Sequence, residues 1–369
     1  MEKVKLIELA NIYLGVTHTP EYVLEGVPFL SVKDISGGKI CFDDCKYISK
    51  EEYNSLSEGA KPKVGDMLFC RVGTLGKPII IPEGTPLFGS FVSLGYLRNK
   101  NEDRCDMNYL RYWMYSNSFW KQVSSNVKGA SQVNLNTGWL SKFEIDLPNM
   151  QDQKYRISVL DKCKAIIEQR EEEIRVLDNL IKARFVELFG DKGYPEDTLL
   201  NLCNIIDYRG KTPEKVEYGL PFITAKNVRM HQMNLEPREY ISKETYDKVM
   251  VRGFPKEGDV VFTTEAPLGN VCRIPHFDTE FYIGQRIVTM QTEKLEPIYL
   301  EYALSSDDFK MKYMEKSSGS TVTGIRVRLL EQLTIPVPPR DIQTQFATFV
   351  EQTDKSKFRK YHNPRGGYL

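Results

Sequence analysis

The sequence predicts a mixed α/β (α+β) protein in which a long helix separates two homologous globular domains. Three observations support this prediction. The first half of the sequence recurs in the second half, an apolar residue recurs every seven positions between the two copies, and each copy has short apolar stretches rather than the long regular alternation of a doubly wound nucleotide-binding fold. The expected domains are a first globular domain over 1–150, a long helix over 151–190, a second globular domain over 191–338, and a shortened C-terminal helix and tail over 339–369.

The internal repeat keeps a constant register over several blocks. The matching pairs are VPFLSVKDI (27–35) with LPFITAKNV (220–228), YISKEEY (47–53) with YISKETY (240–246), and PKVGDMLF (62–69) with PKEGDVVF (255–262). All have an offset of 193, since 220 − 27, 240 − 47 and 255 − 62 are equal. Further along, FEIDLPNMQDQ (143–153) matches LTIPVPPRDIQ (333–343) at an offset of 190, the drift that small insertions in surface loops produce.

Each copy predicts the same series of short elements. Apolar, β-branched stretches predict strands at 28–32 and 221–225. The Ser residues that begin SKEEY and SKETY, Ser49 and Ser242, are typical helix N-caps.

A Gly-Asp turn follows in each copy, and its aspartates are Asp66 and Asp259. Each turn precedes an apolar strand, MLFC or VVFT. A single helix is then expected over about 107–123, with its equivalent over about 297–314.

Between the copies, a seven-residue apolar period predicts a long helix. The positions that make up this seam are Leu160, Ile167, Ile174, Ile181 and Leu188. No Pro or Gly interrupts the stretch before Gly190, and four heptads indicate a coiled-coil seam. Roughly 38 residues at 1.5 Å each would form a rod of about 57 Å. An ordinary amphipathic helix on one domain is the alternative, but the length favours a spacer between two bodies.

A second helix is expected to begin at Asp341 and to end before Asn363-Pro364, at roughly half the length of the first. It would cover only about half of the apolar seam. The remainder would be covered by a partner subunit or a second copy, or would stay exposed.

Composition excludes several classes of protein. The chain of 369 residues has 50 Lys and Arg and 50 Asp and Glu, so it lacks the excess of basic residues that is typical of a non-specific polyanion binder. Its 41% of hydrophobic residues is enough for a folded core. The seven cysteines form no CxxC pair, which favours reduced thiols over a metal site. No apolar signal region or window of about 18 apolar residues occurs, so we expect a cytoplasmic protein without a membrane partner.

The sequence also contains few catalytic signatures. It has no GxGxxG or GxxxxGK[ST] phosphate loop, no Asn/Asp-Pro-Pro-aromatic motif and no HExxH. Asp66 and Asp259 could suggest nuclease carboxylates, but a turn Asp that binds its own backbone explains both copies better.

Polar loops are the remaining candidate site. Their Arg, Lys, Asn, Gln, Ser and Thr residues can bind base edges and phosphates, although each loop alone could simply be solvated. The framework repeats between the copies while loop residues differ, which favours recognition of two different short sequences. The candidate DNA-binding residues are Thr17, His18, Lys33, Arg71, Thr74, Lys77, Lys128, Ser131, Gln132 and Asn134 in the first copy, and Arg209, Lys211, Lys226, Asn227, Thr264, Asn270, Thr321 and Arg326 in the second.

These features together resemble the specificity (S) subunit of Type I restriction–modification enzymes. The resemblance rests on the duplicated domain, the PFLSVKDI and PFITAKNV stretches, the loops KGASQVNL and SGSTVTGI, and the LPNMQDQ and VPPRDIQTQ entries to helices. It covers nearly all of residues 1 to about 357. It implies that each copy is a target recognition domain for one half of a split, asymmetric site in double-stranded DNA.

The same resemblance implies partners and a division of labour. The helices would dock methyltransferase (modification) subunits, and restriction subunits would join that core. S-adenosylmethionine, ATP and Mg would bind to those partners, so this chain would carry no cofactor or metal and would not be an enzyme. A stand-alone DNA methyltransferase or nuclease is the alternative from another class, and a coiled-coil scaffold without DNA specificity is a third.

Overall fold

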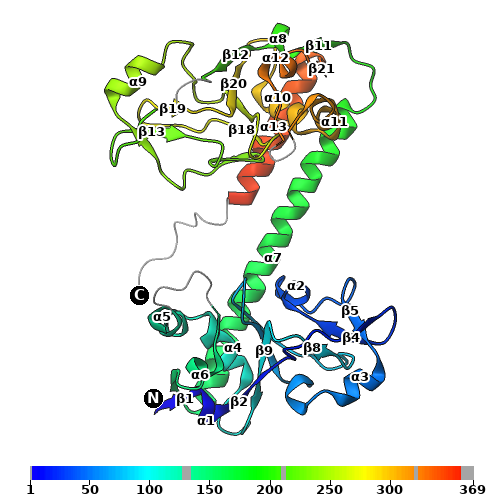
Figure 1. Ribbon diagram of the computed structural model, residues 1–369. Helices are drawn as coiled ribbons and strands as arrows, with labels where there is room; N and C mark the ends of the chain where they lie inside the picture. Colours follow the sequence, from blue (N-terminus) through cyan, green and yellow to red (C-terminus); the bar gives the residue numbers. More distant parts are fainter. Residues whose placement is uncertain (1, 127–133, 209–212, 320–322, 359–369) are drawn as a thin grey trace. The chain divides into compact units, whose positions relative to one another are not determined.

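The computed structural model describes residues 2–126, 134–208, 213–319 and 323–358 (Figure 1). It divides into two compact units, residues 1–169 (unit 1) and 170–369 (unit 2). Each unit combines short strands with helices, which confirms the predicted mixed α/β fold class. Among the described residues, no helix is both long enough and apolar enough to cross a membrane.

Unit 1 begins with a series of short strands and helices. Its strands are β1 (Glu2–Lys5), β2 (Ala10–Leu14), β3 (Tyr22–Val23), β4 (Val27–Leu30), β5 (Lys46–Ile48), β6 (Met67–Cys70), β7 (Gly76–Ile80), β8 (Gly89–Ser90), β9 (Leu94–Asn99) and β10 (Glu144–Leu147). Its short helices are α1 (Leu6–Leu9), α2 (Val32–Ile35), α3 (Lys50–Ser55), η1 (Glu58–Ala60), α4 (Met107–Tyr115), α5 (Asn117–Asn126) and α6 (Thr137–Leu140).

Unit 2 repeats this series. Its strands are β11 (Glu196–Thr198), β12 (Asn204–Asp207), β13 (Leu220–Ile223), β14 (Val228–Arg229), β15 (Gln232–Met233), β16 (Tyr240–Ile241), β17 (Val260–Thr263), β18 (Val271–Arg273), β19 (Tyr282–Ile283), β20 (Ile287–Gln291) and β21 (Thr334–Pro336). Its helices are α8 (Leu199–Leu202), α9 (Lys243–Val249), α10 (Pro297–Ser305), α11 (Asp307–Lys316), α12 (Val327–Leu330) and α13 (Arg340–Phe358).

The sheets of the two units share one topology. In unit 1 the main antiparallel sheet has the order β2-β9-β6-β7, and in unit 2 the order is β12-β20-β17-β18. A two-stranded pair closes each unit, β1 with β10 and β11 with β21. The central strands β6 and β17 are buried along their whole lengths. The sequence repeat is therefore a repeat of architecture.

The expected local signals are confirmed at the helix caps and turns. Ser49 and Ser242 accept hydrogen bonds from the backbone N–H groups three residues later, of Glu52 (3.0 Å) and Thr245 (3.1 Å), as N-caps do. One expectation is wrong. The helix predicted over 107–123 and 297–314 is two helices in each unit, broken at a serine that adopts an extended conformation and caps the second helix.

The Gly-Asp turns form as expected and are closed by their aspartates. Asp66 accepts a hydrogen bond from the Lys63 N–H at 2.7 Å, and Asp259 accepts one from the Lys256 N–H at 2.7 Å. The two differ in their second partner: the Asp66 carboxylate binds Arg98 through both oxygens (2.8 and 2.7 Å), whereas Asp259 accepts from the Gln291 amide at 2.7 Å. Both carboxylates are therefore structural.

The long helix is confirmed as α7 (Met150–Phe189), a continuous helix of 40 residues. Its first part packs on unit 1 through Gln153, whose amide binds the carbonyls of Arg104 (3.0 Å) and Pro148 (2.9 Å). Its last part packs in unit 2, where Phe185 and Phe189 each contact Phe346 of α13 with ring centroids 5.4 Å apart.

The apolar seam is only partly buried, which agrees with the expectation that the C-terminal helix covers only part of it. Ile181 is fully buried and Leu188 packs against the same core, but Leu160, Ile167 and Ile174 are 41%, 57% and 39% exposed. The physical reason is the length of α13, which has 19 described residues and contacts the C-terminal part of α7.

Candidate nucleic-acid interface

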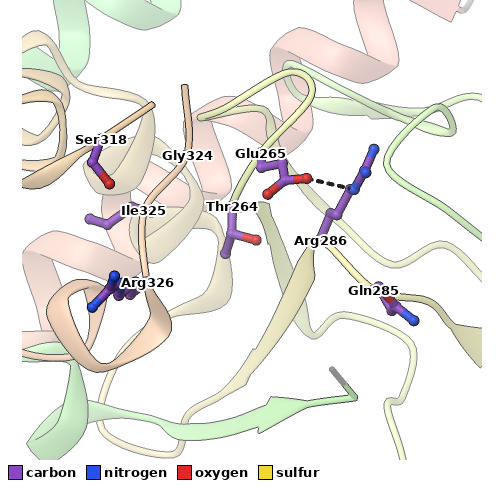
Figure 2. A pocket seen from close by; sticks show the side chains of 8 residues that line it. All are labelled: Thr264, Glu265, Gln285, Arg286, Ser318, Gly324, Ile325 and Arg326. Carbon is purple, nitrogen blue, oxygen red and sulfur yellow. Dashed lines mark ion pairs between the residues drawn. The ribbon is translucent and has the colours of Figure 1, made fainter. Parts of the chain in front are cut away.

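Three segments of unit 2 meet around an open pocket of about 310 Å³. They are the residues after β17, the residues before β20, and the stretch that precedes α12 (Figure 2). The lining is mostly polar and consists of Thr264, Glu265, Gln285, Arg286, Ser318, Gly324, Ile325 and Arg326. We call this site the unit 2 cleft.

Backbone hydrogen bonds fix the three segments to one another. The Thr264 N–H donates to the Arg286 carbonyl at 2.8 Å, and the Ile325 N–H donates to the Thr264 carbonyl at 2.9 Å. Gly324 allows the close approach, because a Cβ there would lie 3.1 Å from both the Thr264 carbonyl oxygen and the Glu265 Cβ. The cleft is therefore held by main-chain contacts and keeps its side chains available.

The charged groups of the cleft lie on two sides. Figure 2 shows Glu265 and Arg286 joined by an ion pair on one side, with Arg326 on the other. The Arg286 Nε lies 2.7 Å from a carboxylate oxygen of Glu265, and both side chains are about half exposed. Arg326 is exposed and occupies the N-cap position of α12.

Unit 1 builds the equivalent backbone arrangement from different residues. Arg71 and Ser93 correspond to Thr264 and Arg286 at the offset of 193 (264 − 71 and 286 − 93). The Arg71 N–H donates to the Ser93 carbonyl at 2.9 Å, which matches the unit 2 contact. The Arg71 guanidinium occupies the interior, where it donates to the carbonyls of Leu135 (3.0 Å) and Val92 (2.7 Å).

Arg71 was expected at a DNA contact, but its place in the structure favours a supporting role. It is only 8% exposed, and burial lowers the pKa of its guanidinium. Its donors bind carbonyls of the protein, so it positions the segment that carries Asn134, which is exposed.

Equivalent lysines, Lys33 and Lys226, are exposed in both units at the offset of 193 (226 − 33). Their neighbours are buried and structural. Asp34 accepts from the Ser31 N–H at 2.7 Å, and Asn227 accepts from the Thr224 N–H at 2.9 Å and donates to the Asn234 carbonyl at 3.0 Å. Asn227 is 1% exposed, so its amide supports the turn that presents Lys226.

The other predicted residues divide by exposure. Thr17, His18, Thr74 and Lys77 are exposed in unit 1, and the His18 Nε2 lies 3.6 Å from Glu52. In unit 2, Thr264 is buried in the cleft wall and the half-buried Asn270 donates to the Val228 carbonyl at 2.8 Å. Six predictions lie outside the described residues: Lys128, Ser131, Gln132, Arg209, Lys211 and Thr321.

Sequence reasoning missed Glu265, Gln285 and Arg286. Arg286 directly precedes β20 and lies in the apolar stretch FYIGQRIV, which has no polar-loop pattern. A signal was present in the repeat, since Arg286 and Glu265 replace Ser93 and Val72 at the offset of 193 (286 − 93 and 265 − 72).

A buried polar cluster lies elsewhere in unit 2 and has a structural explanation. Glu301 of α10 is 1% exposed and accepts hydrogen bonds at both oxygens, from His231 at 2.9 Å and Arg273 at 2.6 Å. The His231 ring also stacks on Tyr302, with centroids 4.2 Å apart. The cluster fixes the β14–β15 turn to α10. Among the described residues, no group of three His, Cys, Asp or Glu residues is placed to hold a metal ion.

Comparisons with known proteins agree on one family. The family model described as Type I restriction modification DNA specificity domain matches residues 1–176 and 196–361. A curated relative, the Type I restriction enzyme MjaVIII specificity subunit of Methanocaldococcus jannaschii, is 25% identical over 289 residues. This match covers 70% of the chain and 65% of the relative, so it spans slightly less than two thirds of the relative's length.

One solved structure shows the same fold at low sequence identity. It is the crystal structure of the S subunit of a Type I restriction-modification system from M. genitalium, with a TM-score of 0.55 and 14% identity. The match covers 97% of this chain and 90% of that chain.

Proposed function

The chain belongs to the Type I restriction modification DNA specificity domain family, and from this premise we propose that it is the sequence-specific DNA-binding subunit of a Type I restriction–modification complex. Each unit recognises one half of a split, asymmetric site in double-stranded DNA. Membership of this family does not favour the alternative function, a stand-alone methyltransferase or nuclease. The chain itself is non-catalytic in this proposal.

One observation carries the proposal. The two units place the same backbone contacts at equivalent positions, yet the side chains there differ in charge. Unit 1 has a buried Arg71 beside Ser93, and unit 2 has an exposed Arg286 beside Thr264. Base recognition depends on which donors and acceptors face the groove, so a scaffold that the two units share, with different side chains on it, supports recognition of two different half-sites.

The residues best suited to contact phosphate are the exposed lysines that occur at the same position in both units. Lys33 and Lys226 are exposed at the same position in both units. A cation that binds phosphate positions a protein on DNA without contributing to sequence preference. These lysines therefore bind both units to the DNA backbone in the same way, while the side chains of the cleft determine which base sequence each unit prefers.

The exposed part of the α7 seam supports a role in assembly. Leu160, Ile167 and Ile174 are apolar residues of one helix that remain 39–57% exposed. Exposed apolar patches commonly mark protein–protein contacts. In this proposal they dock a methyltransferase subunit, restriction subunits join that core, and α7 fixes the gap between the half-sites. S-adenosylmethionine, ATP and Mg bind to those partners.

The proposal is tested by selecting bound molecules from a pool of random double-stranded DNA. The probe is the full chain in complex with its methyltransferase subunit, at a fixed salt concentration, because salt changes affinity strongly. The expected result is enrichment of two short sequence blocks separated by a constant gap. Retention of DNA without sequence enrichment would contradict the proposal.

A further inference from the structure

We infer that Arg286, held in place by Glu265, is a specificity-determining residue for a guanine in the half-site of unit 2. This inference rests on the proposed function and deepens it by naming the base. It starts from the exposed pair in the unit 2 cleft, in which the Arg286 Nε lies 2.7 Å from Glu265 (Figure 2).

The pair leaves donors for a base edge. A guanidinium has five N–H donors in a planar fork, and the contact with Glu265 is made by the Nε edge. The terminal nitrogens can donate to two acceptors side by side. Guanine presents two such acceptors, N7 and O6, in the major groove, and an arginine bound to both is the commonest specific contact.

The Glu265 carboxylate also explains why this arginine suits a base rather than a phosphate. A paired arginine carries a neighbouring negative charge, which weakens its attraction for the negatively charged backbone. A base edge is uncharged and is attracted through hydrogen bonds that the pair leaves available. The exposed Lys226, in contrast, has the chemistry of a phosphate contact.

The backbone under both residues is fixed before DNA binds. Arg286 has a φ of +69°, a left-handed conformation that is strained for a residue other than glycine. Its carbonyl accepts the Thr264 N–H at 2.8 Å, and Glu265 pairs with Gly324 as a β-bridge. Strained, well-supported residues of this kind cluster at ligand-binding sites, and exposed ion pairs contribute too little to stability to explain the strain.

Unit 1 lacks the residues of this ion pair. Ser93 and Val72 occupy the positions of Arg286 and Glu265, so no equivalent ion pair forms there. The contact would therefore belong to one half-site only, which agrees with an asymmetric target.

The experiment uses the full chain with its methyltransferase subunit and selects from a pool of random double-stranded DNA. The variants are Arg286→Ala, Arg286→Gln and Glu265→Gln. Arg238→Ala is the matched control, because Arg238 forms a comparable exposed pair with Glu236 (2.9 Å) away from the cleft. Thermal unfolding of each variant checks that it is folded.

The wild-type half-site of unit 2 is expected to contain a guanine, and Arg286→Ala should lower the preference for it roughly 10- to 100-fold. Arg286→Gln should shift the preference toward adenine, which glutamine binds through N6 and N7. Glu265→Gln should steepen the salt dependence while the guanine preference falls, because the released arginine can contact phosphate. Arg238→Ala should select the wild-type sequence.

Two outcomes would overturn the inference while leaving the proposed function intact. They are a split wild-type target without guanine in the unit 2 half-site, and a split target that Arg286→Ala and Arg286→Gln both select unchanged. If the wild-type complex selects no sequence at all, the proposed function itself fails. The glutamine variant carries the test if the alanine variant does not fold.

Discussion

Arg71 and Leu135 bind each other reciprocally in unit 1. The Arg71 Nε donates to the Leu135 carbonyl at 3.0 Å, and the Leu135 N–H donates to the Arg71 carbonyl at 2.9 Å. The same guanidinium donates to the Val92 carbonyl at 2.7 Å. A buried cation therefore connects three segments that bear polar loops, whereas the equivalent Thr264 and Ile325 of unit 2 are joined by a main-chain hydrogen bond.

We expect Arg71→Met to lower the free energy of unfolding of unit 1 by about 2–3 kcal/mol, because the buried Leu135 carbonyl and the half-buried Val92 carbonyl lose their charged donor. DNA affinity should fall for all sequences alike, since the variant misplaces a loop and removes no base contact. Urea unfolding and competition binding measure the two effects. Lys77→Ala, at an exposed position, is the control for stability. A changed base preference with unchanged stability would show that Arg71 contacts DNA directly.

The two Gly-Asp turns give a matched comparison. Asp66→Asn should cost about 3 kcal/mol, because Arg98 loses a carboxylate that it binds through both oxygens. Asp259→Asn should change stability by less than about 1 kcal/mol. The donors to Asp259 are the Lys256 N–H and the neutral Gln291 amide, and both donate to the same carboxylate oxygen, so no charged partner is lost. Thermal unfolding of both variants checks the difference. Equal losses would contradict the assignment of different partners.

The Asp259 turn also predicts a pH dependence. Burial is the main cause that raises the pKa of the Asp259 carboxyl above its ordinary value. Between about pH 3.9, the ordinary value, and the raised value, the folded chain binds more protons than the unfolded chain, so this carboxyl contributes less stability as pH rises. The stability of Asp259→Asn relative to that of the wild type should therefore be highest at pH 7 and should fall as pH falls through the raised pKa. Urea unfolding of variant and wild type over a series from about pH 4 to pH 7 measures this difference, and a relative stability that rises on acidification would contradict the assignment.

Substitution of two isoleucines of the α7 seam tests separately its role in the stability of the chain and its role in subunit assembly. Ile181→Ala should lower the free energy of unfolding of unit 2 by about 2–4 kcal/mol, because Ile181 is fully buried. Ile167→Ser should change the stability of the chain little, because this side chain is 57% exposed, and should weaken binding of the methyltransferase subunit. Calorimetric unfolding and a titration with that subunit measure the two effects. Unchanged subunit binding by Ile167→Ser would exclude this part of α7 from the interface.

The sequence predicted those features that local patterns determine. The repeat at an offset of 193 located both units, the Ser49 cap and the Gly-Asp turns have local signatures, and uninterrupted heptads predicted α7. The break at Ser116 was missed, because apolar residues continue on both sides and only the serine cap marks the boundary.

The cleft could not be predicted to the same depth, because the direction of a side chain depends on partners distant in the sequence. Arg71 looks like an exposed loop residue, yet its guanidinium lies against Leu135, 64 residues away. Arg286 looks like a strand residue, yet it is exposed beside Glu265. Comparison of the two copies position by position would have found Arg286, since charge replaces a small polar residue there.

Mapping of methylated bases in DNA from cells that express this chain with its methyltransferase subunit tests the central claim most directly. The wild-type chain is compared with two variants. The unit 1 variant carries both Thr74→Ala and Asn134→Ala, and the unit 2 variant carries Arg326→Ala. We predict a split, asymmetric motif with a constant gap, in which each variant relaxes a different half. A single uninterrupted motif, or two variants that alter the same half, would contradict it.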